Sequence, residues 1–314
     1  MAEIEVQAHP LQVIDQGCGL LDRSERGKLA LTGADAKSFL AGQVTNDVEA
    51  LTPGHGCYAA LLTPKGKMRG DLRVLDLGDE LWMDTERVAL QALFDTIRRF
   101  KVGYDVELHK RTLQQSLFSL LGPRAREVAA ADAAGLGVVE HDNAPSPLGV
   151  LVTTDLGVDV VCAAEDAGRV RAALEEAGAV AVDEQAAEVR RVETGRPRYG
   201  VDLDETVIPQ EAGLNERAVS FTKGCYVGQE TVARLHYRGK PNRHLRGLRL
   251  SGPAARGEAL RLGEREVGRL GSVVVSPRFG EIALALVRRE AGVGEVVAVG
   301  DGGVSAEVVE LPFG

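Results

Sequence analysis

The sequence contains few cysteines, and the four that it has stand far apart. Cys18, Cys57, Cys162 and Cys225 include no C-x-x-C pair, which excludes a zinc knuckle. Four cysteines in 314 residues are also too sparse for a secreted disulfide scaffold, and this favours a reducing compartment. Long apolar runs are missing as well, since no stretch reaches the roughly 18 residues of a membrane span. The acidic, polar start predicts no signal peptide, so we expect a cytoplasmic protein.

Several catalytic signatures are absent too. The chain has no G-x-S-x-G, no Walker loop and no H-E-x-x-H, and its six histidines lack the spacing of metal ligands. The net charge of -9 excludes a general polyanion binder, so any bound nucleic acid or phosphate would need a local basic patch. Function must therefore come from local groups of residues rather than from a standard motif.

The first part of the chain predicts an α/β unit. Residues 31–47 and 87–100 place apolar side chains at helical spacing, and residues 57–84 have the pattern of strands around a Pro-Lys-Gly turn. Asp84 or Thr85 is placed to cap the second helix.

A second α/β unit and a β-rich module follow. Residues 113–183 run strand, helix, strand, strand, helix, strand, which matches a split, ferredoxin-like motif. From about Leu245 the chain consists of short strands punctuated by Gly and Pro, which is typical of a small antiparallel barrel. The sequence therefore predicts an α+β protein.

One charged stretch lies at the turn of the first unit. In TPKGKMRGD, the residues Lys65, Lys67 and Arg69 alternate, and Asp71 follows them. On a strand, this alternation would put the three cations and Asp71 on one face. The stretch is either a solvated hairpin face or a site for a phosphate or carboxylate.

A second stretch, RRVETGRPRYGVDLDE, places Glu193 among Arg190, Arg191 and Arg196. A surface ion pair is the simple interpretation. The nearby glycines and prolines indicate a rigid loop, the kind of segment that positions binding residues. A carboxylate held there can accept two parallel N–H bonds from a flat heterocycle.

A third stretch, residues 231–257, contains no acidic residue. It is either a basic linker or a docking surface for a polyanion, such as RNA or an oligocarboxylate tail. Its basic residues are Arg234, Arg238, Lys240, Arg243, Arg246, Arg249 and Arg256.

The run KGCYVGQE raises the question of what Cys225 does. One thiol is too few for an iron–sulfur cluster or a zinc site. A catalytic pair with His236 would need the fold to bring the two together, and a buried, inert cysteine is common. Lys223 lies just upstream, and a helix is predicted to begin just after Cys225. Both features favour the thiolate, so we expect a reactive, solvent-reachable thiol.

These segments together resemble a known family. The run KGCYVGQETVARLHYRGKPNR resembles the signature of YgfZ-type folate-binding proteins, in the superfamily of the glycine-cleavage T-protein, an aminomethyltransferase. The segment around Glu193 and the run LTGADAKSFLAGQVTND resemble the same superfamily, so that the resemblance spans nearly the whole chain. The matching motif residues are Lys223, Gly224, Cys225, Tyr226, Gly228, Gln229, Glu230, Ala233 and Arg234.

The resemblance implies a three-domain cloverleaf around a central folate channel. Residues 1–240 would form a folate-binding region of two intertwined α/β units, and residues 241–314 a C-terminal barrel. The cofactor would be tetrahydrofolate or a one-carbon derivative. The partners implied are iron–sulfur proteins or their assembly factors, and some members of the family are linked to tRNA modification.

The same resemblance implies that Glu193 meets the edge of the pterin and that Asp71 supplies the carboxylate of any one-carbon chemistry. The placement of Lys65 and Arg234 in basic stretches predicts that one of them holds the glutamate tail of the folate. Cys225 is predicted to be reachable from the folate channel and to carry chemistry of its own, by redox exchange or by binding a partner's cluster.

One departure from the T-protein pattern weighs against a transferase, since a T-protein has two acids where this chain has Gly70 and Asp71. The K-G-C-Y-x-G-Q-E element favours another function, because T-proteins lack its cysteine. The leading hypothesis is a tetrahydrofolate-binding accessory protein for iron–sulfur cluster assembly or repair. The alternatives are a folate-dependent aminomethyl or other one-carbon transferase, and an RNA-linked factor that uses residues 231–257.

Overall fold

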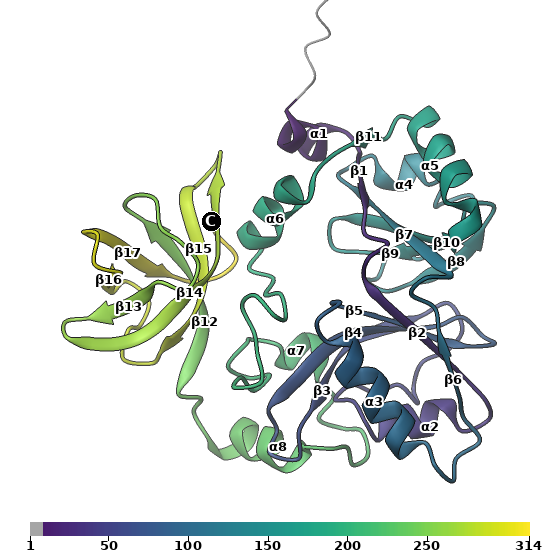
Figure 1. Cartoon of the computed structure of the whole chain (residues 1–314), viewed down its shortest axis with the longest axis horizontal. Coiled ribbons are helices and arrows are strands. Elements are labelled where there is room, and N and C mark those ends of the chain that lie inside the picture. The colour runs from purple at the N-terminus through teal and green to yellow at the C-terminus, as the bar shows by residue number, and fades with distance from the viewer. Residues whose placement is uncertain (1–8) are drawn as a thin grey trace, which may run out of the picture.

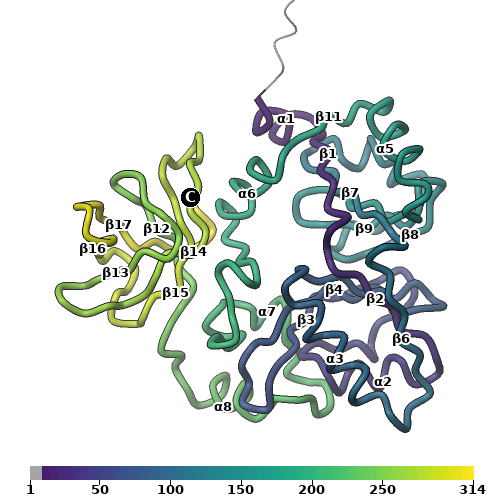
Figure 2. Tube along the Cα trace, in the orientation of Figure 1, coloured from purple at the N-terminus to yellow at the C-terminus, as the bar shows by residue number. Residues whose placement is uncertain are grey.

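Two sheets and a closed barrel make up the part of the chain that the structure describes, residues 9–314. In this computed structural model the two sheets lie one above the other and the barrel lies to one side (Figure 1). Figure 2 shows the chain passing early from the upper sheet into the lower one and later returning, so the two α/β units are intertwined. The predicted α+β class with an antiparallel C-terminal barrel is confirmed.

The five-stranded sheet has the order β3-β4-β5-β2-β6, and all neighbours are antiparallel. Its core includes Phe39 and Leu40 from α2 and Leu93 and Ile97 from α3, as their helical spacing predicted. The elements of this unit are β2 (Gly27–Thr32), α2 (Ala36–Ala41), β3 (Gly56–Leu62), β4 (Met68–Asp76), β5 (Leu81–Thr85), α3 (Leu90–Phe100) and β6 (Glu107–Lys110).

The predicted cap of α3 is wrong. Asp84 and Thr85 are buried in β5, and the helix begins at Leu90 with Ala89 as its N-cap. A turn separates β5 from the helix, so neither side chain can reach the first N–H groups of α3.

The six-stranded sheet has the order β11-β1-β7-β10-β9-β8. Residues 113–183 supply the four predicted strands, β7, β9, β10 and β11, together with β8, which was not predicted. The strand β1 is inserted between β7 and β11. The predicted helix after β7 stops at Val128, because Ala130 adopts a φ of 49°. The elements are β1 (Gly19–Asp22), β7 (Gln115–Leu121), α4 (Ala125–Val128), β8 (Asn143–Ser146), β9 (Gly149–Thr153), β10 (Gly157–Ala163), η1 (Ala164–Asp166), α5 (Ala167–Glu176) and β11 (Val180–Ala181).

The barrel is closed in the order β12-β15-β14-β13-β16-β17 and packs against α6 through β14 and β15. None of the helices in residues 9–314 is long and apolar enough to cross a membrane. The remaining elements are α1 (Pro10–Gln16), α6 (Glu184–Glu193), α7 (Asn215–Ala218), α8 (Gln229–Arg238), β12 (Arg243–Leu250), β13 (Ala259–Leu262), β14 (Arg265–Ser276), β15 (Gly280–Arg288), β16 (Val296–Val299) and β17 (Val304–Val309).

The two sheets meet through an apolar cluster and a buried ion network. Arg73 on β4 donates from Nε to Asp84 on β5 at 2.7 Å and from Nη1 to Asp159 on β10 at 2.7 Å. One guanidinium therefore joins the two sheets. The apolar cluster beside it consists of Leu75, Trp82, Leu117, Val152 and Val161.

Replacing Arg73 should strongly destabilise the protein. Arg73→Ala removes one partner from two buried carboxylates, and an uncompensated buried charge costs about 3–5 kcal/mol. The measurement is the free energy of unfolding in a urea titration. Arg269→Ala is the matched control, because its ion pair with Glu266 is exposed and such pairs contribute little. Equal stability of the two variants would contradict the bridging role.

Candidate functional site

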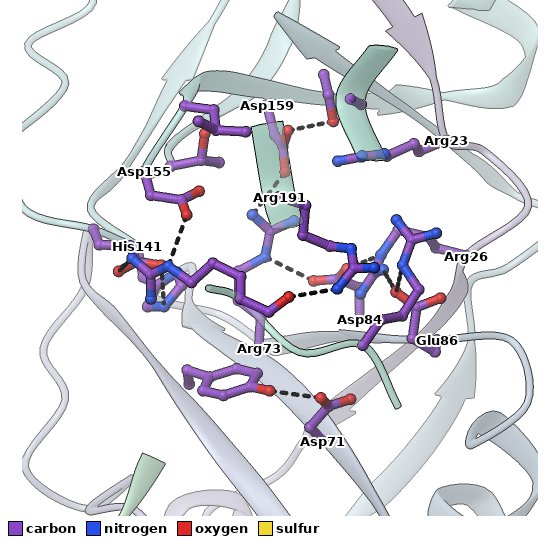
Figure 3. A pocket seen from close by; sticks show the side chains of 18 of the residues that line it. Arg23, Arg26, Asp71, Arg73, Asp84, Glu86, His141, Asp155, Asp159 and Arg191 are labelled. Carbon is purple, nitrogen blue, oxygen red and sulfur yellow. Dashed lines mark hydrogen bonds and ion pairs between the residues drawn. The ribbon is translucent and has the colours of Figure 1, made fainter. Parts of the chain in front are cut away.

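A cavity of about 210 Å³ lies between the two sheets, α6 and the loop that follows α6 (Figure 3). Side chains from both sheets point into it, so it forms only when the two α/β units pack together. Its polar lining includes Arg23, Arg26, Tyr58, Asp71, Arg73, Asp84, Glu86, Ser119, Glu140, His141, Asp155, Asp159, Arg191, Arg196, Arg198 and Arg217.

Every arginine that lines this cavity has a carboxylate partner. Arg198, for example, bonds Glu184 at 2.5 Å and Glu188 at 2.7 Å, both on α6. Because the cations are neutralised within the protein, the cavity does not resemble a phosphate site. It suits an uncharged polar group. The pairs are Arg23–Glu184, Arg26–Asp84, Arg26–Glu86, Arg73–Asp84, Arg73–Asp159, Arg191–Asp202, Arg196–Asp155, Arg198–Glu184 and Arg217–Glu140.

Asp84 is the most strongly paired carboxylate of the cavity. Arg26 lies 2.6 Å and Arg73 lies 2.7 Å from its oxygens. Burial alone would raise the pKa of Asp84, but Arg73 and Arg26 outweigh burial and hold that pKa at about 2. Asp84 is therefore a permanent anion with a structural role.

Asp71 is the carboxylate that is least compensated. It is buried on β4, and the hydroxyl of Tyr58 on β3 donates to its Oδ2 at 2.5 Å. Burial raises the pKa of Asp71 to about 6, although the hydrogen bond from Tyr58 lowers it. The predicted site residue Asp71 thus lies in the central cavity, as a carboxyl group that exchanges its proton near neutral pH.

His141 is a cavity residue that the sequence did not reveal, because a lone histidine has no informative spacing. Its backbone φ is 77°, which is uncommon for a residue other than glycine. Among residues 9–314 its buried Nδ1 finds no hydrogen-bond partner. Burial, followed by the nearby Arg73, lowers the pKa of His141 to about 4, so the ring is neutral at pH 7. Strain and an unpaired atom in one cavity are typical of a ligand-binding residue.

The prediction that Lys65, Lys67, Arg69 and Asp71 share a face is wrong. Lys65 is exposed in the turn before β4, and the pairing of β3 with β4 shifts by one residue at Arg69. This β-bulge breaks the alternation. Arg69 contacts Thr96 on α3 at 3.4 Å, while Asp71 faces the central cavity.

Glu193 lies outside the lining of the Asp71 cavity. It is buried at the end of α6, where it pairs with Arg190 and accepts a hydrogen bond from Ser276 Oγ at 2.6 Å. It lines a neighbouring cavity of about 610 Å³, and residues 154–156 line both cavities. The two sequence-predicted carboxylates are therefore in adjacent cavities rather than in one.

The structure explains the KGCYVGQE motif mainly as an anchor for a loop. The ammonium of Lys223 donates to the backbone oxygens of Val44 at 2.9 Å and Asn46 at 3.0 Å, and it lies 5.0 Å from the centre of the buried Tyr226 ring. Gly228 has a φ of 87° and its position leaves no room for a Cβ, which would lie 2.6 Å from the oxygen of Thr63. The remaining motif residues are the exposed Gly224 and, at the start of α8, Gln229 and Glu230.

Cys225 itself is exposed, whereas Cys18 and Cys162 are buried and Cys57 is half-buried. Burial raises the pKa of Cys18 to about 11 and that of Cys57 to about 12. Solvent reaches Cys225, but the Asp71 cavity does not have Cys225 in its lining, so access to the thiol from a folate channel stays a prediction. The cation and the helix N-terminus that were expected to favour the thiolate are both directed to other groups. The ammonium of Lys223 is bonded to backbone oxygens, and α8 begins only at Gln229, four residues after Cys225.

Much of the basic stretch 231–257 is engaged within the chain. The Arg243 guanidinium pairs with Glu211, that of Arg246 with Glu310, and that of Arg256 donates to backbone oxygens. Arg234 and Lys65 are both exposed. The turn that carries Lys65 packs against α8, which carries Arg234, because a Cβ at Gly66 would meet Thr231. Neither of these two predicted tail contacts lines the Asp71 cavity.

Removing the charge of Asp71 should stabilise the protein at high pH. In wild type the free energy of unfolding should fall as pH rises from about 4 to about 6, because the folded state holds the Asp71 proton more tightly than the unfolded state. Asp71→Asn should remove this slope and add about 3 kcal/mol at pH of about 8. Urea titrations across this pH range provide the measurement. Asp79→Asn, in an exposed turn, is the control, and an unchanged slope in Asp71→Asn would show that Asp71 carries no such penalty.

Known proteins share this architecture. Residues 5–139 match the GCVT N-terminal domain, and residues 243–313 match the glycine cleavage T-protein C-terminal barrel domain. A chloroplastic protein of Arabidopsis thaliana that carries a provisional transferase name is 28% identical over 316 residues, which cover 96% of this chain and 73% of that protein. The crystal structure of the glycine cleavage system aminomethyltransferase T from Bartonella henselae is similar in fold, with a TM-score of 0.86 and 21% identity over 97% of this chain and 88% of that chain. The chain therefore belongs to the family of the glycine cleavage T-protein.

Proposed function

We propose that this chain binds tetrahydrofolate, or a one-carbon derivative of it, in the central cavity. The observation that carries the proposal is Asp71, a buried carboxylate in a cavity whose cations are already paired. The pyrimidinone ring of a reduced pterin is flat and uncharged, and its 2-amino group and ring N–H can donate to one carboxylate. Tyr58 donates to Oδ2 of Asp71, and each carboxylate oxygen can accept two bonds, so Oδ1 and the second lone pair of Oδ2 would take the two N–H groups of the ligand. The unpaired Nδ1 of His141 is a further contact.

The size of the cavity supports binding of the ring rather than of the whole folate. Its volume of about 210 Å³ is below the roughly 300–1,000 Å³ of sites that enclose drug-sized ligands. The aminobenzoyl-glutamate tail would then extend past residues 154–156 toward the cavity of Glu193 or out to solvent. This arrangement keeps Glu193 as a proposed folate contact, and Lys65 and Arg234 as proposed contacts of a long glutamate tail.

We further propose an accessory role in the assembly or repair of iron–sulfur proteins in a reducing, cytoplasmic compartment. Its support is Cys225, an exposed thiol on a loop that Lys223 and Tyr226 fix in place. Within residues 9–314 no group of three or more His, Cys, Asp or Glu side chains is arranged to hold a metal. The thiol would therefore meet the cluster of a partner protein rather than complete a site of this chain.

One-carbon transfer is the second candidate, favoured by the ionisation of Asp71. A carboxyl group with a pKa of about 6 is suited to general acid–base catalysis near neutral pH, and the Arabidopsis relative carries a transferase name. Contact with RNA would use the exposed Arg234, Arg238 and Lys240, since the other cations of that stretch are engaged.

Tetrahydrofolate affinity should fall as the pH drops below about 6. The ionised form of Asp71 is the one that accepts N–H bonds, so each further pH unit should weaken binding about tenfold. Asp71→Asn should weaken binding at least tenfold at neutral pH and abolish this dependence. Anaerobic calorimetry gives the affinities, and the affinity of Glu193→Gln shows how much the Glu193 carboxylate contributes to folate binding. Wild-type affinity and pH dependence in Asp71→Asn would refute the assigned site.

Cys225→Ser should separate folate binding from the iron–sulfur role. In cells that lack the native protein, this variant should restore the activity of iron–sulfur enzymes less well than wild type, while its folate affinity stays unchanged. Cys57→Ser is the control for loss of a thiol. Full restoration by Cys225→Ser, together with glycine-dependent one-carbon transfer by the purified chain, would favour the transferase instead.

A further inference from the structure

A separate cavity of about 360 Å³ lies between α3, the turn that joins β3 to β4, and the loop before α8. It shares no lining residue with the central cavity. Its volume falls in the roughly 300–1,000 Å³ range of ligand sites. The apolar part of its lining consists of Leu61, Leu62, Pro64, Phe100 and Val227, and the polar part of Gln43, Arg69, Asp95, Thr96 and Arg99.

Two guanidinium groups at this cavity lack a carboxylate partner among residues 9–314. Arg69 makes one long hydrogen bond, from Nη1 to Thr96 Oγ1 at 3.4 Å, and Arg99 lies 5.4 Å from the centre of the Phe100 ring. The single acid in the lining, Asp95, accepts a hydrogen bond from the neighbouring Gln91. The arginines of the central cavity all have a carboxylate partner, so the two cavities differ in this respect among residues 9–314.

The position of Arg69 depends on the β-bulge in β4. The extra residue in this strand is Arg69 itself, and a bulge re-aims the side chain that it carries. The irregularity therefore takes Arg69 away from the face of Asp71 and places it beside α3, in the lining of the second cavity.

Gln43 adds an unpaired acceptor to the same cavity. Its Oε1 is buried and, within residues 9–314, receives no hydrogen bond. Buried polar atoms are nearly always paired, and an unpaired one is costly. A ligand with an N–H group would remove this cost.

We propose that the second cavity binds the carboxyl-terminal residue of a partner polypeptide, where that residue is apolar. Arg69 and Arg99 take its carboxylate, Gln43 Oε1 accepts its backbone N–H, and the apolar walls enclose its side chain. An inorganic anion would leave both the walls and Gln43 unused. Because Val227 lines the cavity and belongs to the Cys225 loop, a docked partner would lie against the loop that carries the exposed thiol.

The test uses a fluorescein-labelled peptide that ends in Ala-Ala-Ala-Leu, once with a free carboxylate and once as the C-terminal amide. Fluorescence anisotropy should show the free acid binding at least about tenfold more tightly than the amide, since the charge-assisted bonds are lost in the amide. Arg69→Gln and Gln43→Leu should each weaken binding of the free-acid peptide at least about fivefold. Arg98→Gln, an exposed cation of α3 that does not line the cavity, should leave peptide binding unchanged.

Equal binding of acid and amide to the wild type would overturn the proposal, and this comparison needs no variant. Unchanged peptide binding in Arg69→Gln would also overturn the proposal. The same holds if millimolar inorganic phosphate displaces the peptide completely and the peptide shows no preference for an apolar last residue. Tetrahydrofolate affinity is measured on the same samples and should be unaffected by Arg69→Gln. A failure of peptide docking is thereby distinguished from a failure of the folate site.

Discussion

The guanidinium of Arg73 is the contact on which the arrangement of the two sheets depends. It is buried between Asp84 of its own sheet and Asp159 of the other, at 2.7 Å from each. Taking these charges out of water is expensive, and their mutual pairing is what offsets that cost. The pairing holds the sheets at a fixed separation, with apolar side chains packed on one side of Arg73 and the central cavity open on the other. The site is thus a consequence of how the sheets are joined.

The central cavity shifts the pKa values of two carboxyl groups in opposite directions. Asp84 has two arginine partners that hold its pKa at about 2, whereas Asp71 has a tyrosine hydroxyl and a pKa raised to about 6. One carboxylate therefore serves the structure and the other is left for a ligand. Because the lining arginines all have carboxylate partners, we propose an uncharged ring with N–H donors as the ligand rather than a phosphate. This is the physical basis for assigning a pterin to the cavity.

The sequence predicted those features that depend on local periodicity. Helical spacing identified α3, and dense Gly and Pro between short strands identified the barrel. Spacing along the chain does not determine the face that a side chain reaches, and one bulge residue separated Arg69 from Asp71. The role of Glu193 at a folate stays a prediction, although the sequence could not show that its carboxylate contacts Arg190 and Ser276. The four-residue β1 was missed because a strand of that length has no readable period.

A crystal structure of the chain with a bound reduced folate tests the central claim most directly. The account predicts the pterin in the cavity between the two sheets, with its amino group and ring N–H within hydrogen-bond distance of the Asp71 carboxylate and the tail directed past residues 154–156. A pterin bound against Glu193 that leaves the Asp71 cavity empty would contradict the account.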